Sequence, residues 1–419
     1  ADGGIYDHIG GGFSRYAVDA EWHVPHFEKM LYDNGQLLSL YSEAYQAQPH
    51  PKYQKVVAET IAWATREMRA ENGGFYAALD ADSEGIEGKF YTFHKEEIES
   101  ILGDDAELFN SYFEVNDYGN WVEEQTNILK TSKQATKQIL EAGYTEEQWV
   151  QKLDTLKARV RAVRDKRIHP GLDHKQLTTW NALMMKGLID AYRVFDDASY
   201  LELARDTASF IQSQCFVADI LLHQPVDQNR QIPGFLDDYA FTIEAFIALY
   251  EATFEEKYIQ QAHTLAILAI ARFYDAEHKT FYYTANNAEK LIARKSEVMD
   301  NVIPASSSTL VRMLYKLGTF FDTADFTALA DQVFANVYPH MQNYGSGYSN
   351  WAIQLLEHVY GYYEIAITGD DALAWRRELD KSYIPNKITL GGTKSTLPLL
   401  FHKAGLESKA YLCQNKTCS

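Results

Sequence analysis

The chain has 419 residues, of which 46% are hydrophobic and 13% aromatic, so it can bury a large core. Its 39 lysines and arginines against 58 aspartates and glutamates give a net charge of −19, a field that repels nucleic acid. Three cysteines are too few for a secreted disulfide framework, and no apolar run approaches the ~20 residues that span a bilayer.

The chain starts at Ala1-Asp2-Gly3-Gly4, without an initiator methionine and without a charged-then-apolar signal pattern. We therefore expect the sequence to begin partway through a longer protein. With so few cysteines, a reducing, cytoplasmic location is the default expectation.

Helical periodicity dominates the sequence, because apolar residues recur every three or four positions over long stretches. Thr145-Glu146-Glu147-Gln148 forms a capping box that should start one of these helices. The stretches with this pattern are 35–45, 53–68, 149–163, 179–195, 200–212, 238–253, 256–274, 306–321, 326–341 and 350–359.

Short glycine–aromatic or alternating segments separate the helices, including 73–76, 280–283 and 345–348. The clearest strand pair joins residues 75–80 to residues 89–93. Helical hairpins punctuated in this way predict an α/α toroid, in which each hairpin packs on its neighbours and the loops gather at one mouth.

The last sixty residues change character. Residues 362–368 alternate like a strand, 371–379 are typical of a helix, and 387–390 are β-branched again. We therefore expect an α/α toroid domain at 1–359 and a small α/β tail at 360–419 packed on it.

The densest motif lies near the start of the sequence. It comprises residues 10–19, Trp22 and residues 25–34, and reads Gly10-Gly11-Gly12-Phe13-Ser14-Arg15-Tyr16-Ala17-Val18-Asp19, then Pro25-His26-Phe27-Glu28-Lys29-Met30-Leu31-Tyr32-Asp33-Asn34. With residues 79–85, 88–91, 179–181 and 235–240, this string resembles the YyaL/spermatogenesis-associated thioredoxin-linked family.

The resemblance implies a mainly α, six-hairpin α/α toroid, similar to the N-acylglucosamine 2-epimerases and the six-hairpin glycosidases. Members of the family carry a thioredoxin-like domain ahead of the toroid. That domain is missing from this sequence, and the first toroid helices are expected to be missing too. A thioredoxin-like domain in the full-length protein is therefore an expected partner.

Pro25 is expected at the first position of a helix, with Glu28 in the first turn, where the helix dipole stabilises a carboxylate. His26, Met30 and Asp33 would then share one helical face. We expect His26 and Asp33 to be catalytic residues in a polar cavity. The alternative is that they brace the glycine loop at residues 10–12.

Four further aspartates are candidate acid/base groups. Asp80 and Asp82 would lie on the same side of a strand, where the crowded charges favour one protonated carboxyl group. Asp237 and Asp238 precede a helix expected to begin at Tyr239, so one of them should be its N-cap and the other should face the mouth. Two such carboxyl groups flanking a cavity are what glycoside hydrolysis needs.

A second set of residues is expected to bind substrate. Aromatic faces stack on sugars, amides and charged groups bond to hydroxyls, and a turn at the mouth can supply a histidine, although aromatics at helix starts are more often core residues. The set comprises Arg15, Tyr16, Trp22, Glu28, His174, Trp180, Asn181 and Tyr239.

No cofactor or metal site is expected. Cys413 and Cys418 lack the further ligands of a structural zinc site and are interpreted as two thiols in a terminal tail, while Cys215 is interpreted as a core thiol. Nucleotide-binding and serine-hydrolase motifs are missing from the sequence.

Two functions remain open at this point. The first is a carbohydrate-active enzyme acting on a small-molecule or oligosaccharide ligand, either glycoside hydrolase-like through the carboxyl groups or sugar epimerase-like through His26 and His174. The second is a non-catalytic glycan- or protein-binding module that accompanies the thioredoxin-like domain. A catalyst needs two titratable groups within reach of one substrate atom.

Overall fold

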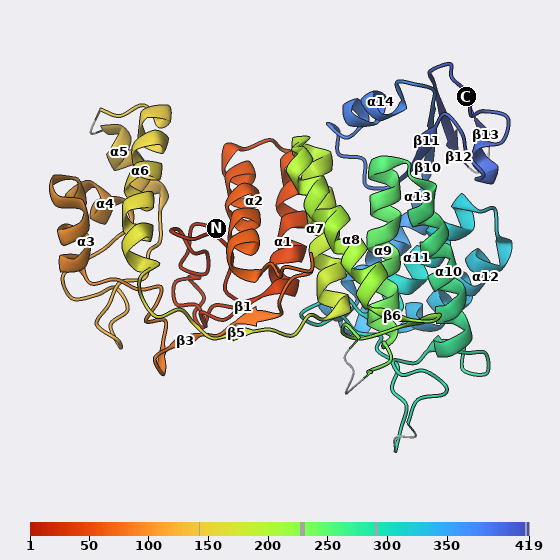
Figure 1. The fold of residues 1–419 in the computed structure, drawn as a ribbon, viewed down its shortest axis with the longest axis horizontal. Coiled ribbons are helices and arrows are strands. Elements are labelled where there is room, and N and C mark those ends of the chain that lie inside the picture. Colours follow the sequence, from red (N-terminus) through yellow and green to blue (C-terminus); the bar gives the residue numbers. More distant parts are fainter. Residues whose placement is uncertain (142, 227–230, 290–291, 415–416, 419) are drawn as a thin grey trace. The chain divides into compact units, whose positions relative to one another are not determined.

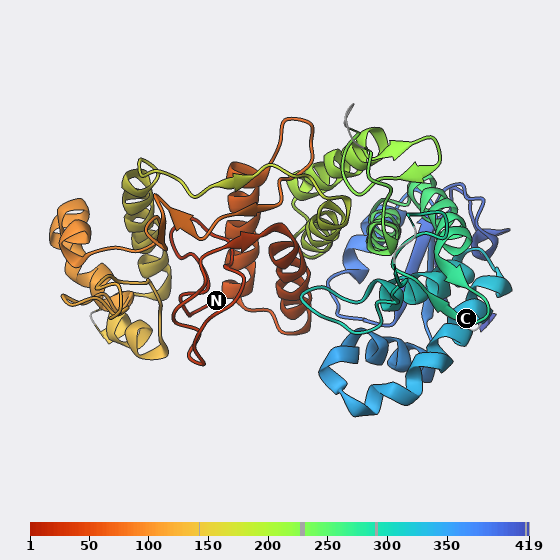
Figure 2. The same cartoon turned by 90° about the horizontal axis from the view of Figure 1, so that it is seen from below.

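The computed structural model describes residues 1–141, 143–226, 231–289, 292–414 and 417–418, and helices dominate it (Figures 1 and 2). The chain divides into two compact units. The first unit comprises Ala1–Asn34, Lys55–Ala70 and Phe75–Lys175, and the second comprises Gly35–Gln54, Glu71–Gly74 and Gln176–Ser419. The expected division at residue 359 is not where these units separate, and it stays a prediction about domains.

The helices fall close to the stretches predicted from periodicity, and α2 continues into a π-helical turn at Ala64–Met68. Their bounds are α1 (Leu31–Ala47), α2 (Pro51–Trp63), α3 (Lys95–Leu102), α4 (Ala106–Tyr112), α5 (Lys133–Glu141), α6 (Glu146–Arg164), α7 (Thr178–Phe195), α8 (Ala198–Gln214), α9 (Leu236–Thr253), α10 (Glu256–Phe273), α11 (Ser306–Phe320), α12 (Ala324–Val337), α13 (Ser349–Tyr360) and α14 (Ala372–Leu379).

The strands are short. They are β1 (Lys29–Met30), β2 (Ala78–Leu79), β3 (Asp82–Ser83), β4 (Ile86–Glu87), β5 (Leu172–Asp173), β6 (Phe216–Val217), β7 (Ile220–Leu221), β8 (Tyr274–Asp275), β9 (Thr280–Phe281), β10 (Tyr363–Thr368), β11 (Lys387–Gly392), β12 (Lys409–Gln414) and β13 (Thr417–Cys418). The pairs β3–β4, β6–β7 and β8–β9 are two-stranded, so they serve as turns between longer elements.

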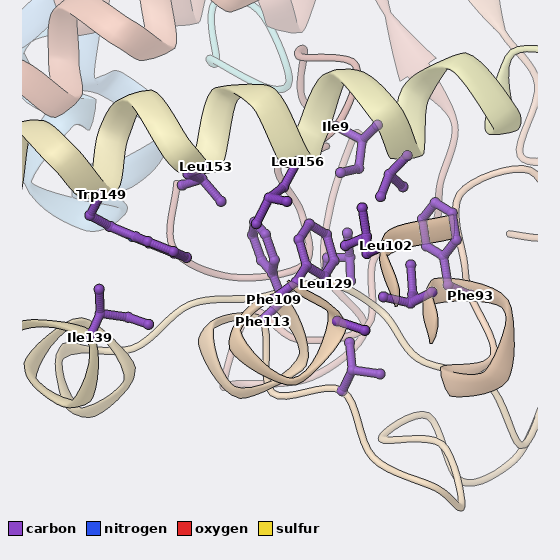
Figure 3. Close-up of a cluster of buried hydrophobic side chains, with 14 residues drawn as sticks. Ile9, Phe93, Leu102, Phe109, Phe113, Leu129, Ile139, Trp149, Leu153 and Leu156 are labelled. Atoms are coloured by element: carbon purple, nitrogen blue, oxygen red, sulfur yellow. The ribbon is translucent and has the colours of Figure 1, made fainter. Parts of the chain in front are cut away.

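In the first unit, a hydrophobic core forms between α6 and the shorter helices α3 and α4. Trp149, Leu153 and Leu156 lie along one face of α6 and point toward Phe109 of α4 and Phe113 directly after it (Figure 3). These positions recur every three or four residues, which keeps them on one side of the helix. The predicted capping box at Thr145 is present and fixes the start of α6.

The glycine loop of the densest motif is held by a buried ion network. Asp7 accepts hydrogen bonds from Lys29 Nζ at 2.9 Å and from Arg164 at 2.8 Å, and Lys29 also donates to the carbonyl of Gly11. A side chain on Gly12, whose φ is +80°, would collide with the ring of Trp63. The most specific string in the sequence thus has a structural role in this part of the fold.

The helix expected to begin at Pro25 does not form there, so this prediction was wrong. Pro25 instead pairs with Ala17, His26 N donates to the carbonyl of Tyr16, and α1 begins only at Leu31. Phe27 adopts a left-handed φ of 42°, which interrupts any helix. Glu28 is therefore not in a first helical turn, and His26, Met30 and Asp33 do not share one helical face.

The expected pairing of residues 75–80 with residues 89–93 was also wrong. β2 pairs with β1 and with β5, which come from distant parts of the chain, and only β3 and β4 form the local hairpin. Local alternation identifies a strand but cannot name a partner far away in sequence.

In the second unit, helical hairpins pack side by side. α7 packs on α8, α9 on α10, and α11 on α12, while α7, α9, α11 and α13 also contact one another in that order. α1 joins this row at Gly35, because a side chain on Gly187 of α7 would lie 2.3 Å from the carbonyl oxygen of Gly35. Two facing glycines thus let two helices approach more closely than any larger side chain would allow.

The end of the chain forms the expected strand, helix and strand. The sheet order is β11-β10-β12-β13, with β10 parallel to β11 and antiparallel to β12, and α14 packs on β10 and β11 (Figure 1). Cys413 is disulfide-bonded, so its interpretation as a free thiol was wrong, whereas Cys215 is a buried thiol as expected. Among the described helices, none has the length and apolar character that crossing a membrane requires.

Candidate functional site

The first turn of α9 carries a pair of adjacent carboxyl groups. The helix begins at Leu236, three residues earlier than expected, so Asp237 and Asp238 lie inside its first turn and neither is the N-cap. The N-cap is Phe235, whose backbone N donates to Asp238 Oδ2 at 2.9 Å. Asp238 therefore satisfies an N–H group that would otherwise lack a partner at the helix start.

Asp238 is fully buried and surrounded by donors. Thr179 donates to Oδ1 from its backbone N at 3.1 Å and from its hydroxyl at 2.7 Å. His223 Nδ1 lies 2.9 Å from Oδ2. Buried carboxylates are stable only when hydrogen-bonded or paired, and Asp238 has both kinds of partner. It joins the start of α7 to the start of α9.

Asp237 has a different environment. It is only 7% exposed, and burial followed by the charge of Asp238 raises its pKa to about 8. His223 opposes that rise, and Glu297 adds to it. The dipole of α9 favours ionisation, but burial beside a second carboxylate outweighs it. Asp237 consequently carries a proton at neutral pH.

His223 completes this pair. Burial disfavours its protonation, but the hydrogen bond to Asp238 and the charge of Asp238 outweigh burial and raise its pKa. Its ring also contacts Phe235 edge-on, with centroids 5.1 Å apart. The histidine is held in one orientation by these two contacts.

Tyr283 and Glu297 lie next to Asp237. The hydroxyl of Tyr283 is hydrogen-bonded to Asp237, and burial followed by the charge of Asp237 raises the pKa of the phenol. The ring of Tyr283 stacks on Phe235 at 5.1 Å with an interplanar angle of 6°. Glu297 accepts from Ser306 N at 3.2 Å and from Ser306 Oγ at 2.7 Å, at the start of α11.

The sequence indicated only part of this group. Asp237 and Asp238 were predicted, whereas His223, Tyr283 and Glu297 were missed because each lies in a loop outside the helical pattern. Tyr283 ends the aromatic segment at 280–283, which was the available signal. His223 and Glu297 have no neighbouring motif that would have identified them.

A second group of expected residues meets in the first unit. Arg15 lies 3.5 Å from Glu28, and Tyr16 stacks on His26 at 4.9 Å. Burial raises the pKa of Asp33 to about 7, with Arg15 opposing the rise and Glu28 adding to it. We call Arg15, Tyr16, His26, Glu28 and Asp33 the first-unit cluster.

Two details of this cluster matter for chemistry. His26 Nδ1 lies 2.9 Å from Glu87 Oε1, so a carboxylate fixes its ring. Asp33 Oδ2 is buried, and within the described part of the chain it has no hydrogen-bond partner. His26 and Asp33 thus fall in one cluster although the helix that was expected to join them is not formed.

Four other expected residues belong to the first unit and are exposed. Asp80 and Asp82 are exposed, and among the described residues no hydrogen bond or ion pair links either one to His26 or Asp33. Trp22 is 59% exposed, and His174 is exposed with its ring edge-on to Tyr76 at 5.0 Å.

The remaining expected residues lie beside the carboxyl pair but turn into the fold. Tyr239 is fully buried, and its hydroxyl accepts from Leu221 N at 3.2 Å. Asn181 is also fully buried and donates to the carbonyl of Leu177, while Trp180 is half-buried. Tyr239 and Asn181 therefore pack in the core beside the site. In the described ranges, no group of three or more His, Cys, Asp or Glu side chains is arranged to hold a metal ion.

Comparison with known proteins places the chain among homologues. No family model matches it. It is 29% identical to the uncharacterized protein B0495.5 of Caenorhabditis elegans, over the whole chain and 63% of that protein. It is 28% identical to human spermatogenesis-associated protein 20, over the whole chain and 59% of that protein. The chain thus spans about three fifths of the length of these relatives.

A solved structure shows the fold. The cellobiose 2-epimerase from Spirochaeta thermophila DSM 6192 matches 82% of this chain and 66% of its own, with a TM-score of 0.50 and 12% sequence identity. The predicted fold class, a mainly α protein of the α/α toroid type, is confirmed. The chain is therefore similar in sequence along its whole length to spermatogenesis-associated protein 20, and its fold is similar to that of the cellobiose 2-epimerase.

Proposed function

We propose that the protein is a carbohydrate-active enzyme that performs acid/base chemistry on a sugar at the start of α9, with Asp237 as the proton donor. One observation supports this assignment most. Two adjacent carboxyl groups have environments that separate their roles, because Asp238 is held by donors while Asp237 keeps a proton near neutral pH. A carboxyl group that keeps its proton near neutral pH can act as a general acid.

Each group then has a defined task. Asp237 would protonate an oxygen of the sugar, and Glu297 would serve as the partner base. His223 is anchored by Asp238 and provides a second charged hydrogen-bond donor beside the acid. A carboxylic acid and a separate carboxylate are the pair that glycosidic cleavage requires, and the same two groups can exchange a proton on a sugar carbon.

Aromatic groups next to the acid fit a carbohydrate ligand. Phe235 and Tyr283 are half-buried and form a stacked pair beside Asp237. Aromatic faces complement the C–H face of a pyranose ring, while the carboxyl groups bind its hydroxyls. The cellobiose 2-epimerase with the shared fold acts on a sugar, which agrees with this substrate class.

The first-unit cluster offers a second proton-handling pair. Asp33 has a pKa of about 7, and His26 is held by Glu87. Catalysis by His26 and Asp33 stays a proposal for the first unit by itself, as do the roles expected of Arg15, Tyr16 and Glu28 in binding substrate.

The test is turnover of sugars in D2O followed by NMR. Mono- and oligosaccharides are incubated with the wild-type protein and with Asp237→Asn, which keeps the shape of the side chain and removes the acid. Asp219→Asn, an exposed position in the β6–β7 turn, is the control. Cleavage of a glycosidic bond or exchange of the C2 proton, lost in Asp237→Asn and kept in Asp219→Asn, would support the proposal.

Two results would overturn it. Full turnover in Asp237→Asn would remove the acid from its role. Binding of a sugar without any turnover by the wild-type protein would support the alternative, a non-catalytic glycan-binding module.

A further inference from the structure

The connection between β9 and α11 carries Glu297 and has a fixed shape. It runs from residue 282 to residue 305, and its described part contains no helix or strand. Glu297 accepts two hydrogen bonds from Ser306 at the start of α11, and Trp351 Nε1 of α13 donates to the carbonyl of Val298 at 2.8 Å. A long connection without regular structure that is nevertheless held in place is typical of binding and catalytic segments.

Asp300 joins this connection to the segment before α13. Its two carboxylate oxygens accept from Ala305 N and Asn350 N, each at 2.9 Å, and its own backbone N donates to the carbonyl of Gly347 at 2.8 Å. Hydrogen bonds to a carboxylate are stronger than those between neutral groups. The segment at residues 344–350 is therefore held against residues 297–300, which begin with the proposed base Glu297.

Tyr344 and Met299 form an exposed apolar surface on these two segments. The side chain of Tyr344 is 57% exposed and that of Met299 is 48% exposed. A side chain on Gly347 would lie 2.6 Å from the ring of Tyr344 and 3.1 Å from the methyl group of Met299, so the ring and the methyl group lie close together. Contact between a thioether and an aromatic ring is favourable. We call Tyr344 and Met299 the aromatic platform.

The distance between the aromatic platform and Glu297 is limited by the chain itself. Met299 follows Glu297 by two positions, and two residues of chain span at most about 7 Å. This span is comparable to the length of one sugar unit. A sugar held at Asp237 and Glu297 is therefore within reach of a second, linked sugar on the aromatic platform.

A single exposed tyrosine is common on protein surfaces and needs no ligand. Tyr344 differs from that case because the hydrogen bonds of Asp300 fix the segment that begins with it. Among the described residues, no other ring and no cation stacks on the Tyr344 ring. The ring is thus held in place and still has a face on which a ligand can stack.

We propose that the substrate is an oligosaccharide and that Tyr344 is a specificity-determining residue, which stacks on the sugar unit next to the one bound at Asp237 and Glu297. The inference rests on the proposed function of that site. The face of the Tyr344 ring complements the C–H face of a pyranose, and Met299 adds apolar contact. Binding of this second unit helps to hold the reacting one, so Tyr344 acts through affinity and takes no part in proton transfer.

Saturation-transfer NMR tests the proposal, because it measures binding and shows any turnover in the same sample. The probes are cellotetraose, maltotetraose and mannotetraose, with glucose and mannose as their monosaccharides. At least one tetrasaccharide should bind more tightly than its monosaccharide. Tyr344→Ala should weaken binding of that tetrasaccharide by about fivefold to tenfold and leave binding of the monosaccharide unchanged.

Two further variants serve as controls. Tyr344→Phe keeps the aromatic face and should retain the affinity for the tetrasaccharide. Tyr118→Ala removes an exposed tyrosine of the first unit and should bind like the wild-type protein. Circular dichroism checks that each variant is folded, which is expected because the substituted rings are exposed.

The proposal is overturned if no tetrasaccharide binds at millimolar concentration, or if Tyr344→Ala binds the tetrasaccharides as well as the wild-type protein does. An equal loss of monosaccharide and tetrasaccharide binding in Tyr344→Ala would also overturn it. Failure of the proposed function gives a different result. Tetrasaccharide binding that depends on Tyr344, without any turnover, would support the aromatic platform and count against the acid role of Asp237 alone.

Discussion

Asp33 in the first unit and Asp237 in the second both have a pKa raised toward neutrality, to about 7 and about 8, but for partly different reasons. Burial is the main cause for each. Asp33 also feels Arg15 and Glu28, whose side chains are 37% and 27% exposed, whereas Asp237 sits beside the fully buried Asp238. Salt screens exposed charges strongly and buried charges much less. The pKa of Asp33 should therefore respond to salt and to changes of its exposed neighbours, whereas the pKa of Asp237 should depend mainly on its buried surroundings.

The largest expected effect is a loss of stability when the buried Asp238 beside Asp237 is removed. Asp238→Ala leaves the N–H of Thr179, its hydroxyl and the N–H of Phe235 without their acceptor, and His223 without its counter-charge. We expect the free energy of unfolding to fall by roughly 3–5 kcal/mol, the cost of removing one partner of a buried pair. Urea denaturation measures it. Asp33→Ala, which removes no ion pair, should cost much less, and equal losses would contradict the contrast.

The pH dependence of stability should distinguish the two aspartates next. An aspartate with a raised folded pKa contributes stability that is fully present below its unfolded pKa of about 3.9 and is lost as pH rises through the folded value. The loss should end near pH 7 for Asp33 and near pH 8 for Asp237. Its slope is at most about 1.4 kcal/mol per pH unit for each group. Urea titrations of Asp33→Asn and Asp237→Asn between pH 5 and 8.5 should each lack one contribution.

A smaller expected effect is a shift in the pKa of Asp237 when the neighbouring charge of His223 is removed. His223 lowers the pKa of Asp237, so His223→Gln should raise it while leaving Asp33 unaffected. Carboxyl ¹³C NMR titration of the two aspartates reads both values in one sample. A change at Asp33 of the same size would show that the substitution acts through the general structure rather than through the local charge.

The smallest expected effect is a shift in the pKa of Asp33 when one of its partly exposed charged neighbours is removed. Arg15→Gln should raise the pKa of Asp33, and Glu28→Gln should lower it. Because both partners are partly exposed, each shift should shrink in 1 M salt, whereas salt should barely move the pKa of Asp237. Equal salt sensitivity at both aspartates would remove the distinction.

Much of the fold could be predicted because helical periodicity is local information. The stripe on α6 and the capping box at Thr145 follow from residues three or four positions apart. The segment around Pro25 could not be predicted in the same way, because its conformation depends on pairing with Tyr16 and Ala17 and on the left-handed Phe27. Such pairing leaves no periodic signal in the sequence.

The residues of the candidate site also fall into those that local sequence predicted and those that depend on packing between distant segments. Asp237 and Asp238 were visible since two adjacent acids precede an apolar helix, while the loops that carry His223 and Glu297 are brought to them by the packing of α7, α9 and α11. Trp22, Asp80 and Asp82 belong to conspicuous motifs but are exposed. A conspicuous motif in the sequence therefore did not show whether its residues form the candidate site or only shape a loop.

Asp380 gives the last sixty residues a consequence for how the protein can be divided. It is fully buried and lies 2.7 Å from Arg193 of α7 and from Arg376 of α14. Thr389 N also donates to Glu251 of α9 at 2.8 Å. A shortened gene ending at residue 359 would remove Asp380, the carboxylate nearest to Arg193, and leave Glu251 at 3.8 Å and the charge of Asp190 to balance it. Such a product should aggregate or be degraded in cells, so expression trials should retain the C-terminal sheet.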